Sequence, residues 1–408
     1  MGEGWKFARV GDLATMVKRG KAPAYSDTGL LVLSQKCVRD GHVDPSFGRR
    51  TDVRSRPVPE WALLRSGDCL VNSTGTGTLG RVGYLSEVPG PATVDGHVTI
   101  VRPDSKKVVP AYLGIVLQWQ QRDLIALQSG STNQTELAPS ALSAVEVSLP
   151  PLAEQRRIVD LVSSIDSRTA ESRRLREAAE AARSAVFEQF AEGMGNGPTV
   201  TLGAIAEVVS GVTKDEKRQV GDRLTEVPYL RVANVQRGYL DLGEMTTIKV
   251  EPARAERLRL KAGDVLFNEG GDRDKLGRGW VWEDQVADCI HQNHVLRARL
   301  NTVDFDPWFV SIWGNSHFGR EWFELNGSQT TNLASLNLST LRVFPIPAIP
   351  PADQRRVVDL WMGFDSVSKL AGDVESATTA LRASLLADLL SGDHQIPETY
   401  DRFLDGAA

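Results

Sequence analysis

The chain has few cysteines and no long apolar run. Cys37, Cys69 and Cys289 lie far apart among 408 residues, which excludes a disulfide framework and fits a reducing compartment. No uninterrupted apolar stretch is long enough to cross a bilayer, and Met1–Lys6 lack the charged-then-apolar pattern of a secretory signal. These absences predict a cytoplasmic protein without a membrane partner.

Motifs of the common catalytic activities are also missing. No Gly-x-x-x-x-Gly-Lys-Ser/Thr phosphate loop occurs, so the chain encodes no ATP-driven motor. The Pro-Pro pairs at 150–151 and 350–351 lack the flanking residues of an adenine-methylase active site. Pro103–Lys107 is similar to a nuclease motif, but no second carboxylate is spaced to hold Mg²⁺ beside a lysine. We therefore expect a protein without catalytic residues.

Two short patterns suggest a cofactor or a metal only at first sight. Gly75, Gly77 and Gly80 have dinucleotide-loop spacing, but a strand-like stretch follows them where that site needs a helix. These glycines instead predict a tight hairpin. Cys289, His291 and His294 could approach a zinc site, but they sit among strand-like residues, and the matching stretch near His97 keeps one histidine. We expect no cofactor and no metal.

Charge excludes one class of nucleic-acid protein. The chain carries 47 Lys and Arg against 52 Asp and Glu, a net charge of −5, which argues against nonspecific coating of nucleic acid. Residues 1–150 nevertheless carry a small excess of positive charge, and the acidic excess lies mostly after residues 150 and 350. Local basic clusters can therefore still face an anion.

What the chain does contain is a duplication of itself. "LRSGDCLVN" (Leu64–Asn72) returns as "LKAGDVLFN" (Leu260–Asn268), and "PPLAEQRRIV" (Pro150–Val159) returns as "PPADQRRVV" (Pro350–Val358). The offset stays near 197 residues over almost the whole chain. So long a period excludes a solenoid, whose repeats run about 20–50 residues.

Each copy divides into a globular part and a helix. The first part has short strand-like runs and one helical stretch, Pro110–Leu127 in one copy and Asp306–Phe323 in the other, which predicts a mixed α and β globule. The second part has a four-heptad coiled-coil period that starts at a proline. The predicted seam consists of Ile158, Leu161, Ile165, Arg168, Ser172, Leu175, Ala179, Ala182 and Val186, and of Val357, Leu360, Phe364, Val367, Ala371, Val374, Thr378, Leu381 and Leu385.

The two seams most simply bury against each other. The prediction is an α+β protein in which two similar mixed α/β domains are joined by two long antiparallel coiled-coil helices, with a pseudo-two-fold internal duplication. The alternative is that the helices pack on other proteins. The expected boundaries are 1–150 for the first domain, 151–193 for the central helix, 194–349 for the second domain, 350–392 for the second helix and 393–408 for a tail.

These residues resemble the specificity subunit of Type I restriction–modification systems. The resemblance covers about residues 5–392, and "SGSTNQTELAPSALSAVEVSLPPLAEQRRIV", its copy, and "GDCLVNSTGTGTLGRVGYL" carry it best. It implies two target-recognition domains, each reading half of a split double-stranded DNA site, and a spacer that docks two adenine-methylase subunits. A translocase/nuclease subunit would join in the restriction complex. The specificity subunit of this family is not itself a catalyst.

Candidate DNA-binding residues follow from side-chain chemistry, since phosphates need basic or hydroxyl donors and bases need side chains with two hydrogen-bonding atoms. Alternatives are a solvated loop for the arginine cluster and turn or cap chemistry for the polar runs. The two arginines that match across the duplication, Arg81 and Arg278, could instead serve the framework. The candidates are Arg49, Arg50, Arg54, Arg56, Asn72, Ser73, Thr74, Thr76, Arg81, Thr132, Asn133, Gln134, Asn268, Arg273, Lys275, Arg278, Gln329, Thr330, Thr331 and Asn332.

The second Gly-rich stretch departs from the first. It carries the acids Glu269, Asp272 and Asp274 and lacks the Ser/Thr richness of its counterpart, which indicates either a different base preference or a poorly functional second domain. Candidate partner-facing residues are the repeated helix starts, with a solvated helix start as the alternative: Gln155, Arg156, Arg157, Gln354, Arg355 and Arg356. Rival functions are a fused methylase–nuclease, which the missing motifs disfavour, and a stand-alone two-headed DNA-binding protein without methylase partners.

Overall fold

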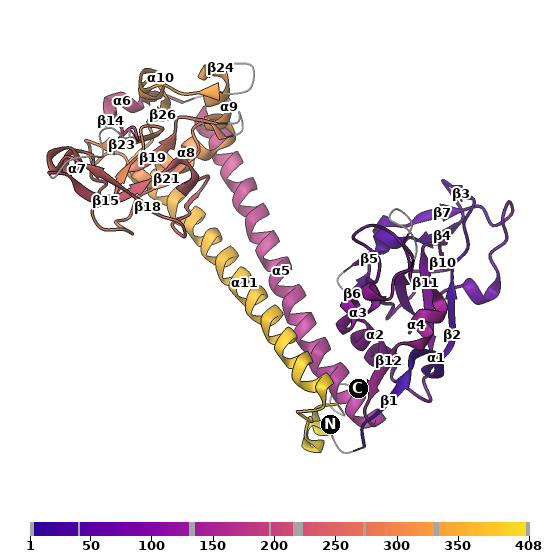
Figure 1. Cartoon of the computed structure of the whole chain (residues 1–408). Helices are drawn as coiled ribbons and strands as arrows, with labels where there is room; N and C mark the ends of the chain where they lie inside the picture. The colour runs from indigo at the N-terminus through magenta and orange to yellow at the C-terminus, as the bar shows by residue number, and fades with distance from the viewer. Residues whose placement is uncertain are drawn as a thin grey trace. The chain divides into compact units, whose positions relative to one another are not determined.

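The computed structural model describes residues 4–39, 41–129, 135–195, 197–214, 223–271, 275–329 and 334–404. The chain forms two compact units. Unit 1 comprises Met1–Ser172 and Asp373–Ala408, and unit 2 comprises Arg173–Gly372. Each unit therefore combines one globular part with portions of two long helices, α5 (Leu152–Gly195) and α11 (Pro351–Ser391) (Figure 1). No helix in the described ranges has an apolar stretch that could cross a bilayer.

Unit 1 is built on two larger sheets and a short strand pair. Their strand orders are β2-β11-β8-β9-β6-β5, β10-β4-β7-β3 and β1-β12. The elements are β1 (Lys6–Arg9), α1 (Val10–Leu13), β2 (Ala14–Arg19), β3 (Tyr25–Ser26), β4 (Leu30–Leu33), η1 (Gln35–Cys37), β5 (Val38–Arg39), β6 (Gly41–Val43), η2 (Pro45–Phe47), β7 (Arg49–Thr51), η3 (Glu60–Ala62), β8 (Cys69–Asn72), β9 (Val82–Tyr84), β10 (Ala92–Val94), β11 (Val98–Pro103), α2 (Pro110–Trp119), α3 (Gln121–Ala126), α4 (Pro139–Ala144), β12 (Glu146–Leu149), η7 (Glu398–Tyr400) and α12 (Asp401–Leu404).

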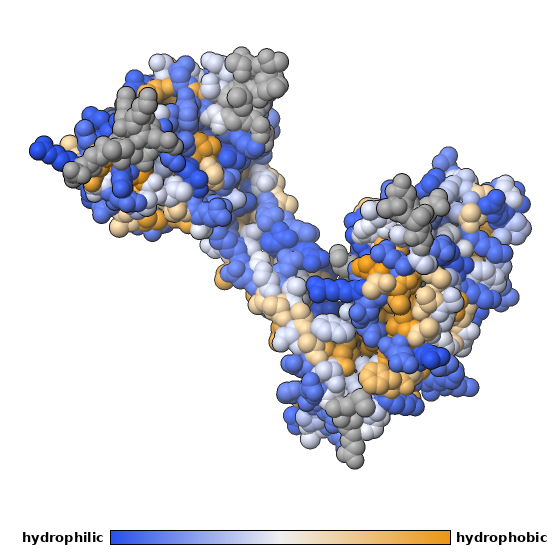
Figure 2. Space-filling model, in the orientation of Figure 1, coloured by the Kyte–Doolittle hydropathy of each residue, from blue (hydrophilic) through white to orange (hydrophobic). Residues whose placement is uncertain are grey.

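The main core of unit 1 joins the large sheet to the long helices. Val71 and Val101 from the sheet and Leu113 from α2 are buried in one cluster with Ile158 of α5 and Leu389 of α11. Apolar surface also gathers around α2–α4 on the face that Figure 2 shows. Burial of this shared cluster is what fixes the two helices to the first globular part.

Unit 2 repeats the plan with shorter sheets. Their orders are β14-β23-β19-β21, β18-β15-β22, β20-β25-β24, β16-β17 and β13-β26. The elements are β13 (Thr199–Thr201), α6 (Leu202–Ile205), β14 (Ala206–Ser210), β15 (Thr225–Leu230), η5 (Val232–Asn234), β16 (Val235–Gln236), β17 (Tyr239–Leu240), β18 (Thr246–Val250), α7 (Pro252–Leu258), β19 (Val265–Asn268), β20 (Gly270–Gly271), β21 (Gly279–Val281), β22 (Ile290–His291), β23 (Val295–Leu300), α8 (Pro307–Asn315), α9 (His317–Asn326), β24 (Ser328–Gln329), β25 (Ala334–Ser335), α10 (Leu338–Arg342) and β26 (Pro345–Pro347).

The helical stretches of the globular parts are each broken once. The predicted helix Pro110–Leu127 becomes α2 and α3, and its counterpart becomes α8 and α9. In unit 2 the break is at Ser316, whose hydroxyl accepts a hydrogen bond from the main-chain N–H of Gly319 at 3.1 Å. Such an N-cap satisfies the first turn of a new helix, so the chain changes direction there.

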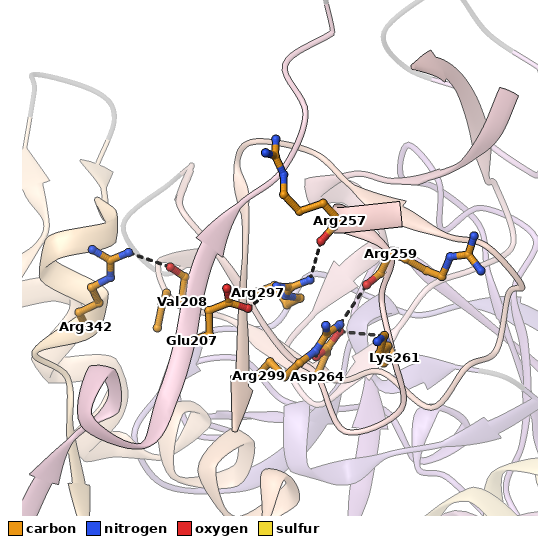
Figure 3. Close-up of polar contacts among 9 residues, drawn as sticks. All are labelled: Glu207, Val208, Arg257, Arg259, Lys261, Asp264, Arg297, Arg299 and Arg342. Atoms are coloured by element: carbon orange, nitrogen blue, oxygen red, sulfur yellow. Dashed lines mark hydrogen bonds and ion pairs between the residues drawn. The ribbon is translucent and has the colours of Figure 1, made fainter. Parts of the chain in front are cut away.

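The repeated Gly-Asp pair is a framework device in both units. In unit 2 the Asp264 carboxylate accepts from the Lys261 N–H at 2.8 Å and from the Arg299 guanidinium at 2.7 and 2.6 Å (Figure 3). In unit 1, Asp68 binds the Arg102 guanidinium at 2.8 Å through each of its two oxygens. In both units the aspartate of this motif therefore connects its turn to a neighbouring strand through an arginine.

The coiled-coil prediction is confirmed for the antiparallel pairing. In unit 1 the hydroxyl groups of Thr169 and Thr378 lie 2.8 Å apart, and Arg382 binds Asp166 at 2.5 Å. Numbering rises along α5 as it falls along α11, so the helices run antiparallel.

Unit 2 shows the same direction in its own portion of the helices. The Arg183 guanidinium donates to Asp365 at 2.7 Å. The Ser368 hydroxyl donates to Glu180 at 3.0 Å.

The predicted seam is correct at some positions and wrong at others. The positions at Ile158, Ser172, Ala179, Val357 and Ala371 are buried as predicted. Of the other thirteen positions, eight are partly buried and five are exposed: Arg168, Leu175, Leu360, Val367 and Leu381.

Neighbouring residues also contribute to the contacts between the helices. Val162 is buried at 1% exposure, and Thr169, Arg183 and Ser368 make cross-helix hydrogen bonds, the first of them with the predicted seam residue Thr378. Heptad spacing permits adjacent rows, and apolar character alone did not separate them.

Candidate nucleic-acid interface

In each unit the Gly-rich hairpin meets residues that flank the following polar run. In unit 1 the hairpin between β8 and β9 makes a bridge from Thr74 to Glu136, and Ser129 also bridges to Glu136. In unit 2, β20 pairs with β25, which pairs with β24. We call this place the polar edge of each unit. It unites two segments that lie about 60 residues apart in the sequence.

The hairpin depends on glycine at two positions. Gly75 has φ +102°, and a Cβ atom there would lie 2.4 Å from the Gln35 Oε1 atom. Gly277 has φ +63°, and its Cβ atom would lie 2.1 Å from the ring of Phe323. Only glycine tolerates both the left-handed backbone and this closeness. The strand that follows, rather than a helix, agrees with the hairpin expectation and not with a dinucleotide loop.

Several candidate residues at this edge are buried in the framework. Asn72, Ser73 and Asn268 are all 0% exposed. The Asn72 amide donates to the Gln35 carbonyl at 3.0 Å, and the Asn268 amide donates to the Val235 carbonyl at 2.8 Å. These three side chains therefore do not face solvent. Asn72 holds the hairpin to η1 and Asn268 holds it to β16, whereas the Ser73 hydroxyl lies 2.5 Å from that of Thr99 in β11.

Other candidates remain accessible at the polar edge of unit 1. Thr76 is exposed, and Thr74 places its hydroxyl 2.7 Å from the His97 Nδ1 atom. The half-buried Arg81 donates to the Gly77 carbonyl at 3.0 Å. Arg19 of β2, which is not among the candidates from sequence, donates to Glu136 at 2.7 Å. Arg19 and Glu136 lie so far apart in the chain that no spacing pattern indicates their contact.

The polar edge of unit 2 has a different side-chain set. Glu269 occupies the place of Ser73, and its carboxylate lies 2.8 Å from the His294 Nδ1 atom. Lys275 and Arg278 are half-buried in the turn that follows, and Gln329 lies in β24. The remaining candidates fall outside the described residues: Thr132, Asn133, Gln134, Arg273, Thr330, Thr331 and Asn332.

The arginine cluster lies on the other sheet of unit 1. Arg49 and Arg50 are on β7, and with Tyr25 they line a shallow pocket of about 390 Å³. The Arg49 guanidinium stacks 3.6 Å from the centre of the Tyr25 ring. Arg56 donates to the Ala22 carbonyl at 2.7 Å, and Arg54 is exposed.

A chain of contacts links this cluster to the polar edge. The Tyr25 hydroxyl donates to Asp95 at 3.4 Å, and Asp95 accepts from the His97 N–H at 2.9 Å. Burial raises the pKa of the Asp95 carboxyl and of the Tyr25 hydroxyl. His97 in turn contacts Thr74. The arginine cluster and the polar edge of unit 1 are thus linked by side-chain contacts that pass through the buried Asp95.

The histidines of unit 2 do not form a metal site in the described ranges, where no suitable cluster of His, Cys, Asp and Glu occurs. His291 is buried, and its Nδ1 atom lies 2.6 Å from the Val295 carbonyl oxygen. Burial lowers its pKa to about 4, so it is neutral near pH 7. Cys289 is buried and unoxidised.

The helix starts behave differently from one another. Gln155 and Gln354 are buried and bind main-chain atoms, Arg157 is buried, and Arg156, Arg355 and Arg356 are exposed. The exposed members are the ones that a partner could reach without rearrangement.

Comparison with known proteins agrees with this architecture. Residues 58–181 match the family described as "Type I restriction modification DNA specificity domain". The EcoKI specificity subunit of Escherichia coli (strain K12) is 23% identical, with 96% of this chain and 89% of that protein covered. Over nearly its full length the chain is similar to specificity subunits of Type I restriction enzymes. The StySPI specificity subunit of Salmonella potsdam is 22% identical over the same shares of both chains.

The fold is similar to that of solved structures over nearly the whole chain. The S subunit of the Type I system from M. genitalium has a TM-score of 0.58 at 16% identity, covering 95% of this chain and 96% of that one. A chain from a structure of Type I complex assembly and conformational transition has a TM-score of 0.54 at 18% identity, covering 97% and 99%.

Proposed function

We propose that this chain is the noncatalytic DNA-specificity subunit of a Type I restriction–modification complex, which binds a bipartite asymmetric DNA site and docks methylase subunits. The observation that carries the proposal is the duplicated polar edge, where in both units a Gly-rich hairpin meets residues that flank a polar run. The named relatives are specificity subunits of Type I restriction enzymes. The proposed target of this chain is DNA, so we expect the chain to act in the cytoplasm.

The accessible side chains suit the two tasks of DNA binding. Arg49 and Arg50 on β7 of unit 1 and Arg54 in the turn that follows supply the basic groups that bind phosphates and fix the register on the duplex. Thr74 and Thr76 at the polar edge supply hydroxyl groups that reach base edges or phosphates. Buried Asn72, Ser73 and Asn268 act only by holding the hairpins in place.

The two edges differ enough to read different sequences. Unit 1 presents Thr74, Thr76 and the Arg19–Glu136 ion pair, whereas unit 2 presents the Glu269–His294 contact. A carboxylate accepts hydrogen bonds where a hydroxyl also donates, so the matching base edges differ. The resulting site has two unlike parts, which makes it non-palindromic.

Two adenine-methylase subunits are the proposed partners, with a translocase/nuclease subunit in the restriction complex. The long helices offer them exposed Arg156, Arg355 and Arg356 and the exposed apolar residues Leu360 and Leu370. A stand-alone two-headed DNA-binding protein is the alternative. Copurification with a methylase encoded beside this chain separates the two.

The decisive experiment is methylation-aware sequencing of host DNA with and without this chain, the methylase being present in both cases. The expected result is adenine methylation at one split, asymmetric site that disappears when the chain is removed. A continuous or palindromic site, or methylation that persists without the chain, would contradict the proposal. As a control, the chain alone should leave the DNA unmethylated.

A further inference from the structure

The same ion pair occurs at both helix starts, but only one copy is covered. Arg157 binds Glu154 at 3.1 Å in unit 1, and Arg356 binds Asp353 at 3.2 Å in unit 2. The first pair has side chains 7% and 8% exposed, and the second has side chains 78% and 49% exposed. Duplicated sequence has thus produced one surface that is occupied and one that is open.

The helix starts themselves are held alike in the two units. The Gln155 side chain accepts from the Val109 N–H at 2.8 Å and donates to the Pro150 carbonyl at 2.8 Å. The Gln354 side chain accepts from the Asp306 N–H and donates to the Ile349 carbonyl, both at 2.9 Å. The first turns therefore present equivalent groups outward, and their different exposure arises from what covers them.

The cover in unit 1 is the C-terminal tail, residues 393–404. The Arg157 guanidinium donates to Asp401 at 2.6 and 2.8 Å, and the Ile396 N–H donates to Glu154 at 2.9 Å. The Tyr400 hydroxyl donates to Asp160 at 2.8 Å. The tail thus places a carboxylate against the cation Arg157, and it places hydrogen-bond donors against the two acids Glu154 and Asp160.

This pairing changes the ionisation of both sides. The hydrogen bonds from Arg157 lower the pKa of Asp401. Burial, followed by the contact with Asp160, raises the pKa of Tyr400 to about 12. The tail segment is therefore bound in its charged and hydrogen-bonded form at neutral pH.

We propose that the first turns of α11, with Asp353, Arg356 and Asp359, are a docking site for an extended segment of a partner protein with the chemistry of the tail. Asp359 occupies the place of Asp160 and is exposed, as is Leu360 beside it. The expected segment carries an aromatic hydroxyl followed directly by a carboxylate, because Tyr400 and Asp401 satisfy the equivalent groups in unit 1. The chain's own tail already occupies the equivalent site at the start of α5. This inference does not depend on the DNA-binding function.

The test uses the full chain and a synthetic peptide of residues 393–404 that carries a photo-crosslinking group at the Phe403 position. Crosslinked residues are identified by mass spectrometry, and affinity is measured by fluorescence anisotropy. The expected result is crosslinking to residues 351–361, with binding weakened at least about tenfold by Arg356→Glu, since a charge-assisted two-point pair is lost. Arg355→Glu is the matched control and should leave binding unchanged, because its counterpart Arg156 stays exposed beside the tail.

Three outcomes would overturn the proposal. The first is crosslinking confined to the start of α5, which would mean that the peptide merely exchanges with the tail. The second is the absence of binding at millimolar peptide. The third is equal binding by the Arg356→Glu chain. Circular dichroism of both variants checks the fold, which should be unaffected because both side chains are exposed. A peptide with Asp401→Asn and Tyr400→Phe should bind more weakly than the original.

Discussion

Asp264 and Arg299 form a two-point ion pair in unit 2, and the Asp264 side chain is 1% exposed. The same carboxylate also accepts the N–H of Lys261, so it has two kinds of donor (Figure 3). Arg297 lies nearby in β23 and donates to Glu207 at 2.9 Å. Because Asp68 and Arg102 repeat the arrangement in unit 1, the pair belongs to the framework that the two units share.

Asp264→Ala should lower the free energy of unfolding of unit 2 by about 3–5 kcal/mol, since it leaves a largely buried guanidinium without its partner. Urea denaturation, followed by tryptophan fluorescence, measures the change. The control is Glu256→Ala, which removes the exposed Arg259–Glu256 pair and should cost at most about 0.5 kcal/mol. Equal effects of the two variants would show that burial of the Asp264 pair is unimportant.

His291 should make unit 2 sensitive to mild acid. Its pKa is lowered to about 4 by burial, whereas the unfolded chain has the ordinary value of about 6.5. Between these values the unfolded state binds a proton that the folded state does not, so stability falls as the pH drops from about 6.5 toward 4. The loss at pH 4 is about 3 kcal/mol.

His291→Val places at this position the residue that unit 1 has there, Val94. Urea denaturation at pH 7 and pH 5 should show a smaller loss of stability for the variant than for the parent chain. Other titrating groups are common to both proteins and cancel in the comparison. An identical loss in both would mean that His291 is not the titrating group.

Arg54→Ala should reduce the salt dependence of DNA binding. A phosphate contact releases about one counterion, so the slope of log affinity against log salt should fall in magnitude by about 1. The measurement is a salt titration of DNA binding by the complex with its methylase. Lys369→Ala, which removes a cation from α11, serves as the control and should leave the slope unchanged.

Thr76→Ala should alter only one part of the recognised site. Thr76 is exposed at the polar edge of unit 1, so its loss should relax base preference there by about 1–3 kcal/mol per affected position. Methylation-aware sequencing of a host that expresses the variant shows which positions become degenerate. Relaxation in both parts, or in neither, would argue against reading by this side chain.

The sequence predicted the elements well because their periods are strong. The duplication, the long helices and strands such as β8 and β11 all followed from spacing and repetition. The exact set of seam residues followed only in part, because apolar residues such as Leu161 and Val162 are adjacent. Cross-helix hydrogen bonds such as Thr169 to Thr378 join a residue outside the predicted seam to one within it, and they depend on a partner about 200 residues away.

Framework and reading residues could not be separated by type. Asn72 and Asn268 have the chemistry that reads adenine, but both are buried against main-chain groups of a preceding segment. Gln155 and Gln354 are likewise polar residues of a type usually found on the surface, but both are buried. In these four cases, a polar residue that occurs at the same place in both copies serves to hold the fold together. Thr76 has no identical counterpart in the second copy.

The joint made by Gln155 and Gln354 has a consequence for how such chains diverge. Each glutamine binds only main-chain groups of the globular part, namely an N–H and carbonyl oxygens. Main-chain groups are present whatever the side chains are, so the joint places little constraint on the composition of the part that it holds. A globular part can therefore change its surface residues, or be exchanged for another with the same backbone, while its attachment to the helix remains intact.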